Sequence, residues 1–197
     1  MTPANAPPRP LLAGAVLCGG RSRRMGTDKA FVEVAGIAMA ERVATALSAG
    51  GCAPVVLVGG DAALLARFGH RVVDDRFPDQ GPAGGVLTAL DAISAGVVVV
   101  AACDLPMLDG PTVATVAAAL ADDTVNAAVA VTDRWQLSLT AWRTAARRDV
   151  ERAWDRGARA LHELVASVAH VEVAIPAAAV RNVNTLDDLS AVDDASR

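Results

Sequence analysis

The chain has 197 residues and a mass of 20.1 kDa; 53% of its residues are hydrophobic, 20% are charged, and the mean hydropathy is +0.35. This composition excludes an intrinsically disordered protein, and the length favours a single domain. Eighteen lysines and arginines stand against 22 aspartates and glutamates, which gives a net charge of −4. Proteins that bind nucleic acid are normally basic. We therefore expect no nucleic-acid partner, and any anion-binding site should be local.

The N-terminal segment divides into a tail and a first apolar run. Residues 1–10 are rich in proline and are predicted to be a disordered tail, which leaves residues 11–197 as one domain. The run Leu11–Cys18 is apolar, but Leu17 stands where a lipoprotein cleavage site needs a small residue. No apolar stretch approaches the ~20 residues of a membrane span. We expect a cytoplasmic protein without a membrane partner.

The cysteines and histidines give no sign of metal binding or covalent catalysis. Cys18, Cys52 and Cys103 are widely spaced and form no CxxC pair. Reduced, buried thiols in a cytosolic protein are the ordinary interpretation of this pattern. The histidines are scattered, and no Ser-His-Asp or Cys-His arrangement can be assigned.

The first half of the chain alternates apolar runs with alanine-rich stretches. The apolar runs lack polar alternation, which is typical of strands buried on both faces of a sheet. The predicted strands are Leu11–Cys18, Pro54–Gly59, Arg71–Asp74 and Val97–Cys103. The predicted helices are Ala40–Ala49, Ala62–Phe68, Gly85–Ala95 and Pro111–Ala121. This alternation predicts an α/β fold with a mostly parallel central sheet.

The second half is less regular. Val125–Thr132 and Gln136–Trp142 are predicted to pair as strands. Ala145–Val168 is predicted to be helical with a break at Gly157. Val171–Ile175 is a predicted late strand, and Leu186–Val192 a closing helix.

The most informative segment, Leu17–Lys29, follows the first strand and reads LCGGRSRRMGTDK. Ligands of α/β proteins bind beyond the carboxyl ends of strands. Gly19 and Gly20 permit close backbone approach and expose N–H groups that can hold phosphate oxygens. The segment carries a charge of +3 in an acidic chain, which indicates a small polyphosphate ligand. The alternative is a solvated, arginine-rich surface loop. The P-loop and GxGxxG patterns do not fit.

Asp104 ends the most apolar strand, so its carboxylate should emerge at the carboxyl edge of the sheet. A carboxylate in that place suits Mg²⁺, which is held by one or two carboxylates together with substrate phosphates. Asp104 also precedes a predicted helix, so a helix N-cap is the alternative role.

Several segments together resemble the molybdenum cofactor guanylyltransferases. The first loop is similar to the family signature LxGGxSxRMGxDKA. Three later segments agree in order: Asp75–Gly85 with DxxP…GPLAG, Cys103–Pro106 with CDxP, and Asn182–Leu189 with NxNTxEDL. The resemblance spans roughly residues 12–192. It implies a three-layer, Rossmann-like nucleotidyltransferase fold. One departure is Val58, which stands near the place of a polar second-strand residue of the family.

The resemblance implies a reaction and a role for each site residue. GMP would pass from GTP to molybdenum-carrying molybdopterin with release of pyrophosphate. Lys29, Arg24 and Asp104 would be catalytic, and Asp104 would hold the cofactor Mg²⁺. Asn182 and Asn184 would bind molybdopterin. GTP would contact Leu17, Cys18, Gly19, Gly20, Lys29, Asp75, Gly81, Gly84 and Asp104.

Two other functions stay open. One is a different small nucleotidyltransferase, either a cytidylyltransferase of the same cofactor or an enzyme that acts on a sugar phosphate. Gly19-Gly20 and the Gly81–Gly85 turn favour guanine over cytosine in this comparison. The other is a non-catalytic carrier that delivers the cofactor to molybdoenzymes. The presence of Lys29, Asp75 and Asp104 together favours the enzyme.

Overall fold

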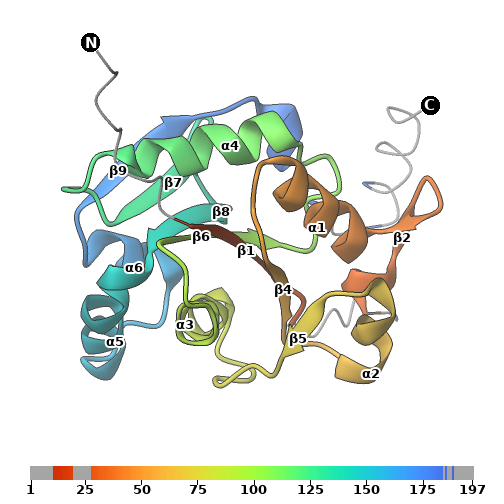
Figure 1. Ribbon diagram of the computed structural model, residues 1–197, viewed down its shortest axis with the longest axis horizontal. Coiled ribbons are helices and arrows are strands. Elements are labelled where there is room, and N and C mark those ends of the chain that lie inside the picture. Colours follow the sequence, from red (N-terminus) through yellow and green to blue (C-terminus); the bar gives the residue numbers. More distant parts are fainter. Residues whose placement is uncertain (1–10, 20–27, 184, 186–187, 189–197) are drawn as a thin grey trace, which may run out of the picture.

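A seven-stranded sheet forms the centre of the molecule in the computed structural model, which describes residues 11–19, 28–183, 185 and 188 (Figure 1). The strand order is β5-β4-β1-β6-β8-β7-β9. β8 pairs antiparallel with both β6 and β7, and the other pairings in this sheet are parallel. The strands are β1 (Leu12–Leu17), β4 (Val55–Val58), β5 (Arg71–Val73), β6 (Val97–Ala102), β7 (Ala127–Val131), β8 (Trp135–Arg143) and β9 (His170–Ala174).

Helices cover both faces of the sheet, so the fold has three layers (Figure 1). One face carries α1 (Met39–Ala49) and α4 (Gly110–Ala118), and the other carries α3 (Pro82–Ala92), α5 (Arg147–Asp155) and α6 (Leu161–Ala166). α2 (Ala62–Leu65) follows β4 near the edge of the sheet. The predicted α/β fold with a mostly parallel sheet is confirmed.

Alternate residues of each strand belong to two different hydrophobic cores, one on each face of the sheet. Val16 and Val99 pack toward α1 and α4, whereas Ala15 and Val98 pack toward α3 and α5. Neighbouring strand residues therefore both meet apolar partners, which explains the continuous apolar runs. A charged side chain placed in β1 or β6 would therefore be out of contact with water on either face of the sheet.

Two local elements differ from the sequence prediction. A short hairpin, β2 (Glu33–Val34) with β3 (Ile37–Ala38), precedes α1, and its two-residue strands are too short to show any alternation. α3 begins at Pro82 rather than near Gly85, because Gly81 adopts a left-handed φ of +77° and proline suits the first helical turn. The break predicted at Gly157 within Ala145–Val168 is confirmed, because Gly157, with φ +106°, lies between the two helices α5 and α6.

The described residues contain five short 3₁₀ segments, of which Thr144–Ala146 precedes α5 and Ala177–Val180 follows β9. Lys29–Phe31 lies between the first loop and β2, Ala66–Phe68 continues α2, and Ala119–Ala121 continues α4. Within the described residues, no helix has the length and apolar character needed to cross a membrane. The predicted tail, residues 1–10, and most of the predicted closing helix lie outside the described residues.

Candidate active site

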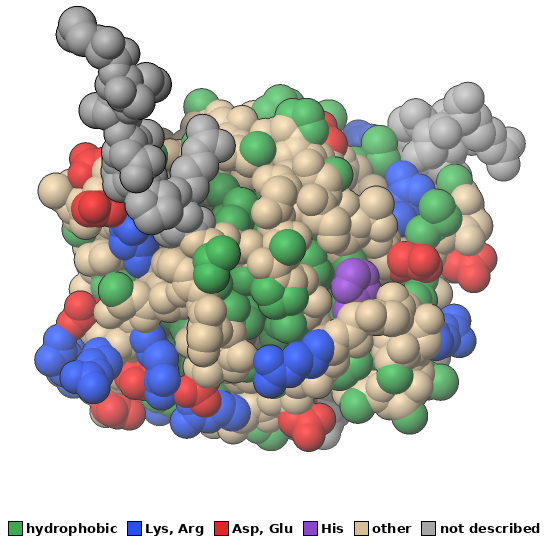
Figure 2. Space-filling model, in the orientation of Figure 1, with side chains coloured by type: hydrophobic (Ala, Val, Ile, Leu, Met, Phe, Trp, Pro, Cys, Tyr) green, Lys and Arg blue, Asp and Glu red, His purple; other side chains and the backbone are tan. Residues whose placement is uncertain are grey.

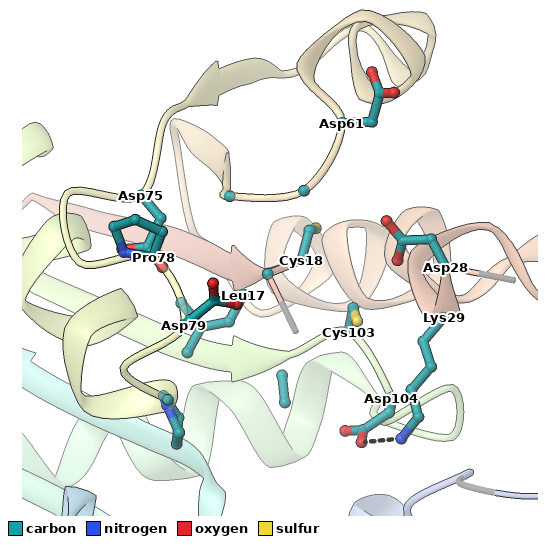
Figure 3. Close-up of a pocket in the computed structure, with 16 residues that line it drawn as sticks. Leu17, Cys18, Asp28, Lys29, Asp61, Asp75, Pro78, Asp79, Cys103 and Asp104 are labelled. Carbon is teal, nitrogen blue, oxygen red and sulfur yellow. Dashed lines mark hydrogen bonds and ion pairs between the residues drawn. The ribbon is translucent and has the colours of Figure 1, made fainter. Parts of the chain in front are cut away.

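A cavity of about 670 Å³ opens at the carboxyl ends of β1, β4 and β6 (Figure 3). Each of these parallel strands ends at the same edge of the sheet, so the loops that follow them converge there. Most of the residues predicted to bind GTP line this cavity: Leu17, Cys18, Gly19, Lys29, Asp75, Gly81 and Asp104. Residues 75 positions apart in the sequence thus share one site.

An ion pair joins Lys29 to Asp104 across one wall of the cavity (Figure 3). Lys29 Nζ lies 3.1 Å from Asp104 Oδ2, and the two side chains are 19% and 16% exposed. The other carboxylate oxygen, Oδ1, accepts a hydrogen bond of 3.3 Å from Asn182 Nδ2. Lys29 is the single lysine of the chain, whose other basic side chains are arginines. The cavity wall therefore holds a cation that can bind phosphate and a carboxylate that can bind a metal ion.

Local structure explains where Lys29 stands. Asp28 precedes the 3₁₀ segment Lys29–Phe31, and its Oδ1 accepts a hydrogen bond of 3.1 Å from the Ala30 backbone N–H. The Ala30 side chain is fully buried, which fixes this turn against the core. A capped turn with a buried anchor leaves the Lys29 side chain directed to the cavity.

Asp104 is not the N-cap of the following helix. That role belongs to Asp109, whose Oδ1 accepts a hydrogen bond of 2.8 Å from Thr112 N. The alternative interpretation of Asp104 as a cap is therefore wrong. The backbone carbonyl of Asp104 accepts a hydrogen bond from Val183 N, at 3.0 Å, which fastens the segment after β9 to the end of β6.

Two glycines that sequence analysis did not single out bring the ends of β1 and β4 together. Gly59 and Gly60 have φ of +72° and +77°, a region that favours glycine. A Cβ at Gly59 would lie 3.1 Å from the Gly19 Cα, and one at Gly60 would lie 3.2 Å from the Cys18 carbonyl oxygen. The Gly59-Gly60 pair after the second apolar run was the signal in the sequence that could have predicted this close approach. Side chains there would push the first loop away from the cavity.

Asp75 stands on the opposite wall from the Lys29–Asp104 pair (Figure 3). Its Oδ1 accepts hydrogen bonds from Phe77 N, at 2.9 Å, and from the Thr88 hydroxyl, at 3.0 Å. A Cβ at Gly19 would lie 3.7 Å from the other oxygen, Oδ2. One oxygen of Asp75 is thus tied to the protein and the other faces the glycine loop.

Gly84 lies beside the cavity rather than in its wall. A Cβ at Gly84 would come within 2.7 Å of the Phe77 Cβ. The glycine therefore lets the first turn of α3 pack against the loop that carries Asp75. Val58, near the family's polar second-strand position, is 1% exposed and packs in the core toward α3.

A second cavity of about 590 Å³ borders the hairpin between β7 and β8. Arg134, Gln136 and Ser138 contribute polar groups, and Asn182 lies at this cavity as well. Since Asn182 also donates to Asp104, one amide connects the second cavity to the carboxylate of the first. Of the two asparagines predicted to bind molybdopterin, Asn182 is placed here and Asn184 lies outside the described residues.

The three cysteines are free and buried, as predicted. Burial raises the pKa of the Cys18 and Cys52 thiols to about 12 each, and it raises that of Cys103 well above its usual value. Thiols with such pKa values stay protonated near neutral pH. Cys18 and Cys103 line the cavity as buried thiols, and their raised pKa values disfavour the thiolate form.

The donor set near Asp104 suits a metal ion that arrives with its substrate. Among the described residues, no cluster of three or more histidine, cysteine, aspartate or glutamate side chains could enclose a metal. Mg²⁺ commonly takes one or two protein carboxylates and completes its shell with waters and substrate phosphates. The single carboxylate of Asp104 at a cavity large enough for a nucleotide fits that pattern.

Two predicted residues of the first loop, Gly20 and Arg24, lie outside the described residues.

Away from the cavity, arginines of α5 are paired with acidic neighbours. Arg147 bridges Asp91 and Glu151, at 2.6 Å and 3.1 Å. Figure 2 shows basic and acidic side chains mixed on this part of the surface. The cationic groups there neutralise carboxylates rather than forming a uniform basic patch.

Comparisons with known proteins show the family of this chain. The family model described as the MobA-like NTP transferase domain matches residues 14–173. A molybdenum cofactor guanylyltransferase from Cupriavidus metallidurans is 34% identical over 187 residues, which cover 90% of this chain and 92% of that protein.

Solved structures share the fold. Molybdopterin-guanine dinucleotide biosynthesis protein A from Archaeoglobus fulgidus superposes with a TM-score of 0.79 at 24% identity, covering 93% of this chain and 98% of that one. The 2-C-methyl-D-erythritol 4-phosphate cytidylyltransferase from Thermus thermophilus gives a TM-score of 0.71 at 19% identity, covering 93% and 98%. The same architecture therefore occurs in proteins named for different nucleotides, so the fold alone does not select the base.

Proposed function

Because this chain belongs to the MobA-like NTP transferase family, we propose that it transfers GMP from GTP to molybdenum-carrying molybdopterin and releases pyrophosphate. The observation that carries the proposal is that Gly19, Lys29, Asp75 and Asp104 all line the first cavity. These residues come from three separate segments of the family pattern. The identity of 34% with a molybdenum cofactor guanylyltransferase over nine-tenths of the chain supports the choice of reaction.

The proposed reaction needs charge stabilisation and positioning more than a protein nucleophile. The terminal phosphate of molybdopterin attacks the α-phosphorus of GTP, a new P–O bond forms, and the α–β phosphoanhydride bond breaks. A phosphate monoester dianion is already deprotonated, so the attack requires no general base. The electron pair of the broken bond leaves on pyrophosphate.

In this proposal, Lys29 stabilises the negative charge that develops on the α-phosphate and on pyrophosphate. Its ammonium is paired with Asp104 at 3.1 Å, so it is already held at the cavity. The predicted partner Arg24 would add a second cation from the first loop. Backbone N–H groups at Gly19 and Gly20 would hold the triphosphate.

Asp104 would hold Mg²⁺ together with phosphate oxygens of the nucleotide, and the ion would neutralise phosphate charge. The Lys29 ammonium shields the Asp104 carboxylate in the structure described here. If Lys29 turned to the phosphates, the Asp104 carboxylate would be free of this ion pair and could hold the cation.

The second cavity is the proposed place of the acceptor. Asn182 lines this cavity and donates a hydrogen bond to Asp104 of the first cavity. A ligand in the second cavity would therefore reach toward the bound α-phosphate. The polar groups of Arg134, Gln136 and Asn182 suit a pterin, whose ring edge carries both hydrogen-bond donors and acceptors. Asn184 would assist Asn182.

The buried, unpaired thiols support a reducing, cytoplasmic location. Molybdoenzymes that use the dinucleotide form of the cofactor would be the recipients of the product.

The test is pyrophosphate release from the purified protein with Mg²⁺, molybdenum-loaded molybdopterin and either GTP or CTP. We expect release with GTP at a clearly higher kcat/KM than with CTP. A higher value with CTP would overturn the guanylyl assignment. Nucleotide binding without any pyrophosphate release would favour the carrier. The Lys29→Met variant, measured beside the wild type, shows whether the release depends on this cavity.

A further inference from the structure

Thr88 connects α3 to the carboxylate on the far wall of the first cavity. It is one of few buried polar side chains among the described residues and is 1% exposed. Its hydroxyl lies 3.0 Å from Asp75 Oδ1 and 2.9 Å from the Gly84 carbonyl oxygen, and it accepts a hydrogen bond of 3.1 Å from Arg76 N. A threonine in a helix usually bonds only the carbonyl four residues earlier. The contact with Asp75 is therefore an additional one.

The loop with Asp75 is fastened to one face of α3 at three points. Phe77 packs against Gly84, Asp75 meets Thr88, and Arg76 pairs with Asp91 at 2.8 Å. The three helix positions are spaced by four and by three residues, so they lie on the same face. The first part of the loop, Asp75 to Phe77, is thus held by a helix that itself packs on the sheet.

The consequence for Asp75 is a fixed carboxylate. Oδ1 receives the Phe77 N–H and the Thr88 hydroxyl, whereas Oδ2 faces the glycine loop at Gly19. The hydroxyl has one hydrogen to share between Gly84 and Asp75, and an ionised carboxylate is the stronger acceptor. An aspartate fixed by both donors cannot turn freely about its Cβ–Cγ bond. Its outer oxygen keeps one direction.

We propose that Thr88 is a positioning residue, which orients Asp75 to accept a hydrogen bond from an N–H or O–H group of the bound nucleotide. This inference rests on the proposed function, because it gives the nucleotide contact of Asp75 a structural cause. Thr88 itself does not line the cavity, and so it acts through Asp75. Neither the sequence motif nor the cavity wall identifies it.

The first experiment measures nucleotide Kd for wild type, Thr88→Val and Thr88→Ser by calorimetry, with GTP and CTP in parallel. Valine keeps the shape and removes the hydroxyl, so we expect an affinity loss of about tenfold for the preferred nucleotide. Serine keeps the hydroxyl and should remain within about threefold of wild type. We expect kcat at saturating nucleotide to stay within about twofold, because Thr88 touches no reacting group.

Thr140→Val is the matched control. Thr140 is equally buried, its hydroxyl accepts a hydrogen bond of 2.8 Å from Trp142 Nε1, and it lies on β8 away from the first cavity. This variant should lose stability without losing nucleotide affinity. A comparable affinity loss in Thr140→Val would mean that general destabilisation explains the result, which would overturn the proposal.

A double-mutant cycle with Asp75→Asn completes the test. If Thr88 acts through Asp75, Thr88→Val should change Kd by less than about threefold in the Asp75→Asn background. An equal loss in both backgrounds, or an unchanged Kd in Thr88→Val alone, would overturn the positioning role. Preference of the wild type for CTP would instead overturn the guanylyl assignment, and the cycle would then be evaluated with CTP.

Discussion

Strands β5, β4, β1 and β6 run in parallel and end at the first cavity, whereas the antiparallel pair β7–β8 borders the second. The first cavity is built from loops that follow strand ends, with glycines in close contact and charges at Lys29, Asp75 and Asp104. The second is built on a hairpin whose own residues, Thr132 to Ser138, form much of the wall.

The difference follows from strand direction. Parallel strands bring separate loops to one edge, so distant short motifs can assemble into a phosphate site. β8 runs the other way, and so its first residues reach that edge directly from β7. The register between β7 and β8 shifts at Val129/Ala130, which alters how the hairpin tip is presented. One half of the sheet thus supplies converging loops, and the other half supplies a continuous hairpin as a cavity wall.

The largest expected effect is that of Asp104→Asn. The variant keeps an oxygen and loses the charge, so kcat should fall by about 10²–10³-fold. The melting temperature without ligand should change little, since Asp109 rather than Asp104 caps α4. Stabilisation by GTP with Mg²⁺ should shrink. Steady-state kinetics and thermal melts on one preparation check both. Unchanged turnover would remove the first cavity from the chemistry.

Lys29→Met should lower kcat by about 10²-fold while the fold persists. Because Lys29 is the single lysine, reductive methylation with ¹³C-formaldehyde labels one side chain besides the terminal amine. The label keeps the positive charge, and its NMR signal should shift when GTP binds. A signal that stays in place at saturating GTP would contradict the phosphate role of Lys29.

Asn182→Ala tests the second cavity. Removal of the amide should raise KM for molybdopterin about tenfold, because a polar contact to the acceptor is lost. KM for GTP should rise less, since Gly19, Lys29 and Asp75 of the first cavity stay in place. Initial rates with each substrate varied in turn separate the two. A larger effect on GTP than on molybdopterin would mean that Asn182 belongs to the first site.

The smallest effect concerns the thiols. Burial raises the pKa of Cys52 from 9.0 to about 12, so the folded state retains a proton that the unfolded state loses above pH 9. Stability is therefore complete below pH 9 and declines as pH rises toward 12, by about 1 kcal/mol per thiol at pH 10. Melting curves of wild type and Cys52→Ala at pH 8 and 10 check this. The decline should be smaller in the variant, and an equal decline would contradict it.

The fold class and the motifs of the first cavity could be predicted from the amino-acid sequence. Apolar strands buried on both faces need unbroken runs such as Val97–Ala102, and such runs are readable without a structure. The predicted role of the first loop depends on its residue types, glycine for close approach and lysine for charge. Asp104 could be predicted because it follows a readable strand, whereas the resemblance to the family motif is what distinguishes Asp75 from Asp74.

Contacts between side chains that are distant in the sequence could be identified only in the tertiary structure. The Lys29–Asp104 pair, the Asn182 amide beside it and the Thr88 hydroxyl behind Asp75 join residues that are 75, 78 and 13 positions apart. No local pattern encodes such contacts, because they depend on strand order and on how closely α3 approaches the sheet. A buried threonine in a helix reads as an ordinary core residue until its partner on the neighbouring loop is known.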